Sequence, residues 1–507
     1  MTILDLLPPG VDPDARIVGR AEPRVWTPPL RELTPETSYG FEVIDFAQEI
    51  GHPLLPWQQF AVIHGGELLP DGRPRFRIVL LLVSRQNGKT ELPVVLSVWW
   101  QFRQKLPLIL GTSTKLAYAR ESWQKAVKLV RSTRALDGLH EPGRKWFRTT
   151  NGETESWTVD GARYLIAASN AEGGRSLTID RGIADELRQH RTYEAWEAFE
   201  PACSPPGAQI WALSNAGDSR SVVLNDLQDS AHDFIETGVG DPRLGLLEWS
   251  APPDADPEDV DALLQANPRV GHGLDLDVLL HAAARAKRLG GDALNGFKTE
   301  RMCIRVKVLR PAVATAAWER CEDAGPLDTS VRNVALCLDL SPDGQHATLA
   351  AAQVQADGRV RGELLHAWSG ATAASDLERS LPAIVAAVKP RSVGWFPKGP
   401  AAAVATKLGS GWAPRSVAVK ELRSEAPAVC MGLAKEVTAR TFAHSADPLL
   451  TDHVTGAEKL ASGGGWVFSR ADGAHVDAAY AMAGAVHLAR LQPRAPRSTR
   501  RVHVPGA

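Results

Sequence analysis

One short segment, residues 84–90, constrains the fold of this chain more than any other part of it. An apolar run at residues 76–83 precedes it, and residues 91–102 follow with the apolar spacing of a helix. A strand, a tight loop and a helix in this order direct backbone N–H groups and the helix N-terminus at a bound phosphate. The segment therefore predicts a phosphate-binding loop made of Ser84, Arg85, Gln86, Asn87, Gly88, Lys89 and Thr90.

The last two residues of this loop would carry most of its chemistry. We expect Lys89 to pair with the β- and γ-phosphate oxygens and Thr90 to coordinate Mg²⁺. Val83 stands where the common pattern Gly-x-x-x-x-Gly-Lys-Ser/Thr has its first glycine, so a chance Gly-Lys-Thr at a strand–helix junction is the competing interpretation. Arg85 is unusual inside such a loop and could stabilise charge in cis.

Hydrolysis at such a loop needs one carboxylate in the water shell of Mg²⁺ and a second that activates the attacking water. Asp185 and Glu186 follow a short, interrupted apolar run and supply both. Asp180 competes for the first role, but no second acid follows it. An exposed helix start with an acidic first turn is the structural alternative for the preferred pair.

A further apolar run, within residues 210–218, ends in small polar residues. Ser214 and Asn215 lie at its end and could sense the γ-phosphate and relay its loss. The pattern is weak by itself, because Asn-Ala-Gly is also an ordinary turn.

Apolar runs alternate with helical patterns through most of the chain, which indicates α/β sheets covered by helices. Because 507 residues exceed one ordinary core, we expect several domains. The first α/β unit should have a mainly parallel sheet, and the second, which opens with three strands joined by short turns, a mixed one. The predicted parts are an extended arm (1–40), the first domain (41–235), a connecting subdomain (236–325), the second domain (326–490) and a basic, disordered tail (491–507).

Composition indicates a protein of the reducing cytosol without a membrane anchor. The five cysteines are scattered with no Cys-x-x-Cys pair, and no apolar run reaches transmembrane length. The N-terminus lacks the basic start and long apolar run of a signal peptide. A net charge of −2 means that any polyanion contact requires local basic patches. The candidates are Arg131, Arg134, Lys145, Arg148, Arg497, Arg500 and Arg501.

In their order along the chain, the motifs resemble those of the large terminase subunit of tailed bacteriophages. They are Trp57-Gln58, SRQNGKT, STKLAYARE, GRS, ADELR and SNAGD, followed by an α/β unit that opens on Asp339. The resemblance extends over residues 45–490, and the loop with an internal arginine and no first glycine is part of it. It implies an ATPase that drives double-stranded DNA into a procapsid, and a nuclease that cuts concatemeric DNA.

The same resemblance implies roles and partners. Gln58 would contact adenine, Asp185 would support Mg²⁺, Glu186 would be the catalytic base, and Ser214 and Asn215 would couple hydrolysis to movement. The implied partners are DNA, the small terminase subunit and the portal of the procapsid, in the host cytoplasm. A ring of subunits would assemble on the portal, although the isolated chain could be monomeric. A trans-acting arginine could be Arg120, Arg144 or Arg163, which the sequence does not rank.

The second unit resembles an RNase H-like nuclease, whose carboxylates hold two Mg²⁺ or Mn²⁺ ions. Asp339 is central in an otherwise apolar strand, where a charge is costly unless it binds a metal or an ion-pair partner. Asp477 begins a helix with small, apolar faces, where helix capping is its structural alternative. Phe396 stands where the family has its middle carboxylate, so we hypothesise a weakened or altered metal site. The substitutes are Glu421 and Glu425, each of which could equally be a surface charge.

Two other functions remain open at this stage. The chain could be a P-loop helicase or translocase whose second domain is not a working nuclease. It could also be a non-catalytic scaffold with a relic nucleotide fold, although Lys89, Thr90 and Glu186 argue against that interpretation.

Overall fold

The computed structural model divides into two compact units, Met1–Leu309 and Arg310–Ala507. The residues that the structure describes are 17–114, 116–136, 145–150, 153–168, 177–306, 311–328, 333–408, 411–423, 425–470 and 475–492. Part of the predicted arm (1–16), Arg144, the GRS motif at 174–176 and the predicted tail from 493 onward lie outside them.

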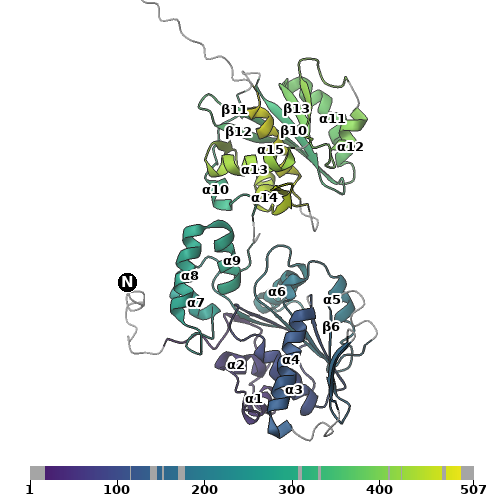
Figure 1. Ribbon diagram of the computed structural model, residues 1–507, viewed down its shortest axis with the longest axis vertical. Helices are drawn as coiled ribbons and strands as arrows, with labels where there is room; N and C mark the ends of the chain where they lie inside the picture. Colours follow the sequence, from purple (N-terminus) through teal and green to yellow (C-terminus); the bar gives the residue numbers. More distant parts are fainter. Residues whose placement is uncertain are drawn as a thin grey trace, which may run out of the picture. The chain divides into compact units, whose positions relative to one another are not determined.

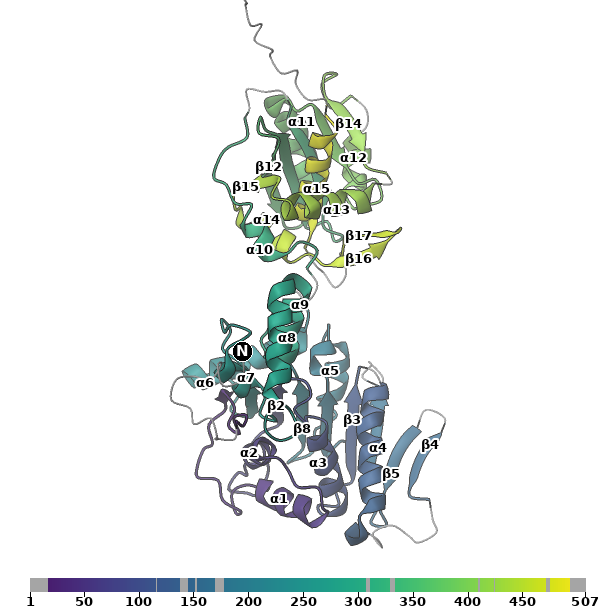
Figure 2. The same cartoon turned by 60° about the vertical axis from the view of Figure 1, so that its left-hand side comes forward.

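The first unit is built on a nine-stranded sheet with the order β1-β9-β2-β8-β7-β3-β6-β5-β4. The strands from β9 to β6 are parallel, while β1 at one edge and β5 and β4 at the other join antiparallel, as Figure 2 shows for β4 and β5. The prediction of a mainly parallel sheet is therefore confirmed. The strands are β1 (Val25–Trp26), β2 (Ile78–Val83), β3 (Leu108–Ser113), β4 (Phe147–Thr150), β5 (Glu153–Trp157), β6 (Arg163–Ala168), β7 (Arg181–Asp185), β8 (Gln209–Ser214) and β9 (Leu244–Trp249).

Helices cover both faces of this sheet, because alternate side chains of each strand point to opposite sides. On β2, Val79 and Leu81 join the core beneath α1–α4, whereas Leu80 and Leu82 join the core beneath α5 and α6. Burial on both faces explains why β2 reads as a continuous apolar run. The helices are α1 (Gly40–Glu49), α2 (Pro56–Gly65), α3 (Glu91–Phe102), α4 (Leu116–Ser132), α5 (Glu194–Phe199) and α6 (Val222–Thr237).

The interval 236–325 is divided between the two units. Its strand β9 pairs with β2 inside the first sheet. Three following helices pack around a small core of their own, and Figure 1 shows them as a separate group. They are α7 (Val260–Ala266), α8 (Leu276–Leu289) and α9 (Gly291–Arg301).

The second unit has a mixed six-stranded sheet with the order β14-β13-β10-β11-β12-β15. The pairs β10–β11 and β11–β12 are antiparallel, and the other three pairs are parallel. The predicted mixed sheet is confirmed. The strands are β10 (Ala335–Leu340), β11 (His346–Val354), β12 (Val360–Ser369), β13 (Ser392–Trp395), β14 (Ala418–Glu421) and β15 (Phe442–His444), beside a hairpin of β16 (Lys459–Ser462) and β17 (Gly465–Phe468).

Two apolar cores sandwich this second sheet. Cys337 of β10 contributes to the core beneath α10 and α13–α15, and its neighbours Leu336 and Leu338 contribute to the core beneath α11 and α12. No helix in the described part of the chain is long and apolar enough to cross a membrane. The helices of this unit are α10 (Thr315–Glu319), α11 (Ala373–Val388), α12 (Ala402–Leu408), α13 (Ala426–Thr438), α14 (Pro448–Thr455) and α15 (Asp477–Arg490).

Candidate functional site

The predicted loop lies between β2 and α3. Val83, at the usual place of the first glycine, is the last residue of β2 and pairs with Trp249 of β9. Gln86 and Gly88 both have positive φ, 68° and 88°. This left-handed conformation suits glycine and strains other residues. The Gly88 carbonyl then accepts a hydrogen bond from the Glu91 N–H at 3.1 Å, which turns the chain into α3.

A cavity of about 650 Å³ lies against this loop. Its volume falls in the range of small-molecule and cofactor sites. Tyr118, Lys125, Arg269 and His272 also line it, although the sequence analysis did not single them out. The predicted residues that line it are Gln58, Arg85, Gln86, Gly88, Lys89, Thr90, Asp185 and Glu186.

Lys89 joins the loop to both predicted carboxylates. Its Nζ lies 2.9 Å from Oε1 of Glu186 and 3.9 Å from Oδ1 of Asp185, and all three side chains are largely buried. Asp185 is the last residue of β7, while Glu186 follows it with a left-handed backbone (φ 57°). The preceding strand, which looked interrupted at Arg181 and Gly182, is continuous and buried.

The surroundings of Asp185 and Glu186 shift the pKa values of these two acids in opposite directions. Burial would raise the pKa of Glu186, but the charges of Lys89 and Arg188 outweigh it and lower that pKa to about 2. Burial raises the pKa of Asp185, although Lys89 opposes the shift. Neighbouring carboxylates whose pKa values move apart are suited to different roles. Glu186 stays ionised and can act as a base, whereas Asp185 becomes fully ionised when a cation binds beside it. Asp180 instead accepts a hydrogen bond from the Leu108 N–H at 2.9 Å, which is a structural role.

Gln58 lines the cavity, yet its amide is engaged by the protein's own backbone. Its Oε1 accepts from the Leu55 N–H at 2.8 Å, and its Nε2 donates to the Gly88 carbonyl at 3.0 Å. In this structure the side chain therefore fixes α2 to the phosphate-binding loop. A contact of Gln58 with adenine remains a proposal. It would use the second N–H of Nε2 and the second lone pair of Oε1.

Two loop residues lie beneath the cavity rather than on its wall. Ser84 is fully buried, and its hydroxyl has no hydrogen-bond partner among the described residues. Asn87 donates to Oδ1 of Asn267 at 3.1 Å and accepts from the Arg269 N–H at 3.0 Å. The segment before α8 thus supports the loop, a contact between distant parts of the chain that the sequence pattern does not indicate.

Ser214 and Asn215 do not line the cavity. Oγ of Ser214 accepts from the Arg188 N–H at 3.1 Å, and Nδ2 of Asn215 donates to the Thr299 carbonyl at 3.4 Å. They connect the end of β8 both to the turn that carries Glu186 and to α9. This position, away from the cavity wall, suits a relay rather than a direct contact with the phosphate.

Glu300 of α9 is a charged partner that the sequence analysis missed. Its carboxylate accepts from Nη1 of Arg188 at 2.8 Å and lies 2.9 Å from Nε of Arg85. Arg188 also reaches Glu186 at 3.2 Å. Alternating charges therefore connect Arg85 to Lys89 through Glu300, Arg188 and Glu186.

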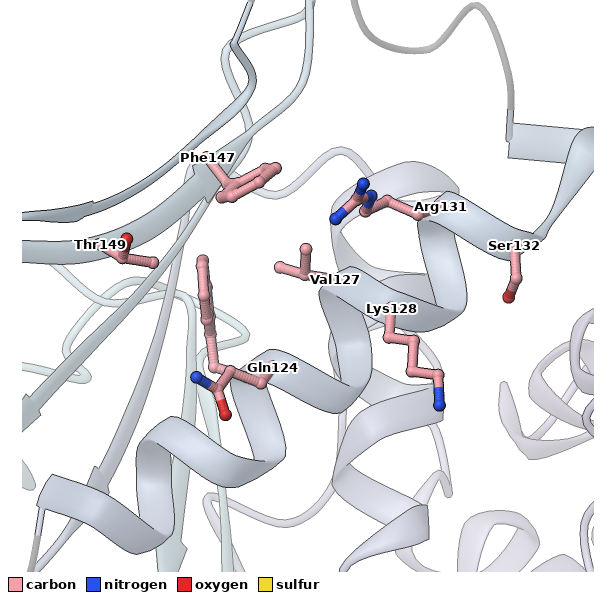
Figure 3. A pocket seen from close by; sticks show the side chains of 8 residues that line it. Gln124, Val127, Lys128, Arg131, Ser132, Phe147 and Thr149 are labelled. Carbon is pink, nitrogen blue, oxygen red and sulfur yellow. The ribbon is translucent and has the colours of Figure 1, made fainter.

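The candidate arginines outside the loop differ in their surroundings. Arg120 is exposed on α4, and Arg163 pairs with Glu155 at 2.6 Å. Arg148, a candidate DNA contact, also pairs with Glu155 at 2.6 Å. Arg131 lies at a second cavity of about 390 Å³ between α4 and β4, with Phe147 across from it (Figure 3).

In the second unit, the structure brings Asp339 and Asp477 together. Both are fully buried, and Asp477 is near enough for its charge to affect the titration of Asp339. Burial raises the pKa of Asp339 to about 7 against the opposing charge of Arg470, and Asp477 adds to the rise. Arg470 donates from Nη2 to Oδ2 of Asp339, so the predicted ion pair is present, while the role of Asp339 as a metal ligand stays a prediction.

The middle carboxylate has no equivalent in the described residues. Phe396 is buried and packs edge-on against Tyr480, with ring centroids 5.3 Å apart. Glu421 lies on the edge strand β14, where it pairs with Arg423. Glu425 lies 3.4 Å from His487, ten residues along α15 from Asp477, or roughly 15 Å at 1.5 Å per residue. No group of three or more His, Cys, Asp or Glu side chains is placed to hold a metal ion in the part of the chain that the structure describes.

No protein-family model matches the sequence, and no curated protein matches it. Comparison of structures finds the large terminase of bacteriophage HK97, with 18% identity and a TM-score of 0.47, covering 89% of this chain and 99% of the other.

Two further likenesses concern bound ligands in the other proteins. A thermophilic bacteriophage large terminase in complex with ATP-gamma-S is 10% identical, with a TM-score of 0.32, over 89% of this chain and all of the other. The large terminase nuclease of the thermophilic phage G20c with bound cobalt is 14% identical, with a TM-score of 0.27, over 36% of this chain and 98% of the other. Structural matches to phage large terminases thus extend over about nine-tenths of this chain.

Proposed function

We propose that the first unit binds ATP with Mg²⁺ and hydrolyses it. The observation that carries this proposal is Lys89, which lies between a phosphate-binding loop and two buried acids at the wall of one cavity. The loop lacks a side chain at Gly88, where the positive φ lets the backbone approach a ligand. Hydroxyl, carboxylate and ammonium groups at one wall fit a triphosphate with a hard divalent cation.

In this proposal each residue has a defined task. Lys89 leaves its carboxylate partners and pairs with the β- and γ-phosphates, which frees Glu186 to accept a proton from the attacking water. Thr90 and Asp185 would hold Mg²⁺, which supplies charge neutralisation at the phosphates. Because Arg188 stays paired with Glu186 at 3.2 Å, the base remains oriented when Lys89 moves. Arg85 is exposed enough to turn toward the phosphates.

We further propose that hydrolysis drives translocation of double-stranded viral DNA into a procapsid. The motifs named in the sequence analysis support this step by resemblance. By the same resemblance we propose three partners: the portal, the small terminase subunit and further copies of this chain in a ring. In the second unit, Asp339 and Asp477 would hold Mg²⁺ or Mn²⁺ for cleavage of concatemeric DNA. Three of their buried oxygens, Oδ1 of Asp339 and both of Asp477, have no hydrogen-bond partner among the described residues and fit a cation.

The alternative is a DNA translocase whose second unit does not cut. The pairing of Arg470 with Asp339 and the apolar Phe396 favour it. A supercoiled-plasmid assay with Mn²⁺ separates the two functions: cutting that disappears in Asp339→Asn supports the nuclease. Cutting absent from the wild type supports the alternative. Asp357→Asn, in a surface turn, is the matched control because its carboxylate contacts only the nearby Arg359 in the described structure.

The ATPase proposal is tested by phosphate release from ATP with and without double-stranded DNA. Lys89→Met should abolish it, since the buried acids lose their cation and the phosphates lose theirs. Lys105→Met replaces an exposed lysine paired with Asp160 at 2.8 Å and should leave the rate unchanged. Equal rates in Lys89→Met and wild type would overturn the proposal.

A further inference from the structure

Two buried aspartates in the second unit lie on elements that pack closely together, the helix α15 and the strand β10. Asp477 is the first residue of α15, and Asp339 lies near the end of β10. At Gly484 of α15, an added Cβ would lie 2.3 Å from Sγ of Cys337 in β10. The absence of that side chain lets α15 pack closely on β10, and the charge of Asp477 acts on Asp339 across this contact.

These carboxylates are incompletely satisfied. Asp477 is fully buried, and neither of its oxygens has a hydrogen-bond partner among the described residues. Asp339 is equally buried, and its Oδ1 is likewise without a partner. Since a buried ionised carboxylate is very costly without compensation, the site calls for positive charge beyond what the hydrogen bonds supply.

One cation is already present and rigidly held. Arg470 donates from Nη2 to Oδ2 of Asp339 and from Nη1 to the Leu340 carbonyl at 2.8 Å. Its guanidinium carbon lies 4.0 Å from the centre of the Tyr480 ring. Tyr480 is itself fixed by a hydrogen bond from its hydroxyl to the Phe468 carbonyl at 2.7 Å. A guanidinium bound on several sides behaves as a fixed part of the site.

The nearest histidine does not supply the missing charge. Nδ1 of His453 lies 3.6 Å from Oδ1 of Asp477, but it accepts a hydrogen bond from the Ala478 N–H at 3.2 Å. A nitrogen that accepts this bond presents a lone pair rather than a proton to the carboxylate. Asp477 therefore faces no cation in the described structure.

We propose that Arg470 is the built-in cation of this site, so that the second unit binds one divalent cation rather than two. Among the described residues, two carboxylates and one guanidinium leave a single uncompensated charge. The ion would lie on Asp477 and the free oxygen of Asp339, while Arg470 occupies the other oxygen of Asp339. This inference rests on the nuclease function proposed above and specifies how the site compensates for the third carboxylate that the described residues do not supply.

The test is the number of Mn²⁺ ions bound per chain, measured on the full-length, nucleotide-free protein by calorimetry and by the electron paramagnetic resonance signal of free Mn²⁺. We expect one ion for the wild type and for Arg470→Lys, which keeps the positive charge. Arg470→Gln, which frees Asp339, should bind two. Asp477→Asn should weaken binding by at least about tenfold.

Two ions in the wild type, or none, would overturn the inference, as would an unchanged count in a folded Arg470→Gln variant. If that variant does not fold, the wild-type count and the loss in Asp477→Asn still decide the matter. Ion counting does not depend on DNA cleavage. A single ion without plasmid cutting would therefore contradict the nuclease proposal and leave this inference intact.

Discussion

Replacement of Glu186 by glutamine is the sharpest perturbation of the proposed ATPase site. The side chain keeps its shape and its position beside Lys89 and Arg188, at 2.9 and 3.2 Å in the wild type, but loses its charge. Loss of a positioned general base lowers the rate by about 10²–10⁴-fold. This corresponds to about 3–5 kcal/mol in activation free energy. We expect kcat to fall by this amount while nucleotide binding is retained.

The assay is steady-state phosphate release, together with equilibrium binding of a fluorescent ATP analogue. Glu121→Gln is the matched control, because Glu121 also lines the cavity but is exposed and pairs only with Lys125 at 3.5 Å in the described structure. A kcat for Glu186→Gln within the same order of magnitude as the wild type would refute the assignment. So would an acid limb of kcat/KM near the ordinary glutamate pKa of 4.5 that vanishes in this variant, because the charges of Lys89 and Arg188 should keep Glu186 ionised there.

The remaining predictions concern stability. Burial would raise the pKa of Glu248, but hydrogen bonds from His232, Ser250 and Gln228 outweigh this effect and lower that pKa from 4.5 to about 2. The resulting stability is fully present above pH 4.5 and is lost as pH falls toward 2, so Glu248→Gln should cost about 3 kcal/mol at neutral pH in urea unfolding. A difference that does not shrink in acid would contradict this. Gly484→Ala should cost about 1–3 kcal/mol through the clash with Cys337, whereas Gly432→Ala, in an open helical position of α13, should stabilise by about 0.5–1 kcal/mol. Equal midpoints for the two alanine variants would refute the packing argument.

The residues on either side of the loop were sufficient to predict the strand before it and the helix after it. A fully apolar run before residue 84 and helical spacing after residue 90 are properties of adjacent residues, and the structure places β2 and α3 there. The sheet types followed in the same way from runs of residues. Parallel strands buried on both faces are apolar throughout, and short turns in the second unit require antiparallel neighbours.

Contacts between distant segments could not be predicted in this way. Glu300 reaches Arg85 and Arg188 only because α9 packs near the end of β8, and no periodicity in the sequence encodes that approach. Val25 and Trp26 pair with β9 across more than two hundred residues. Two residues are too few to show an alternating pattern.

In the second unit, too, local patterns were predicted from the sequence and contacts between distant segments were not. The apolar surroundings of Asp339 marked it as a buried charge, and it is one. Its partner Arg470 lies 131 residues away in sequence and just before a stretch that the structure does not describe. Only the fold shows that Glu421 and Glu425 pair with basic side chains of their own.

The central claim is that two separate sites on one chain perform ATP hydrolysis and DNA cleavage. It is tested most directly by measuring DNA-stimulated ATPase and Mn²⁺-dependent plasmid cutting side by side in the wild type, Glu186→Ala and Asp339→Ala. The account predicts that ATPase is lost only in the first variant and cutting only in the second. Persistence of both activities in both variants, or loss of ATPase in Asp339→Ala, would contradict it.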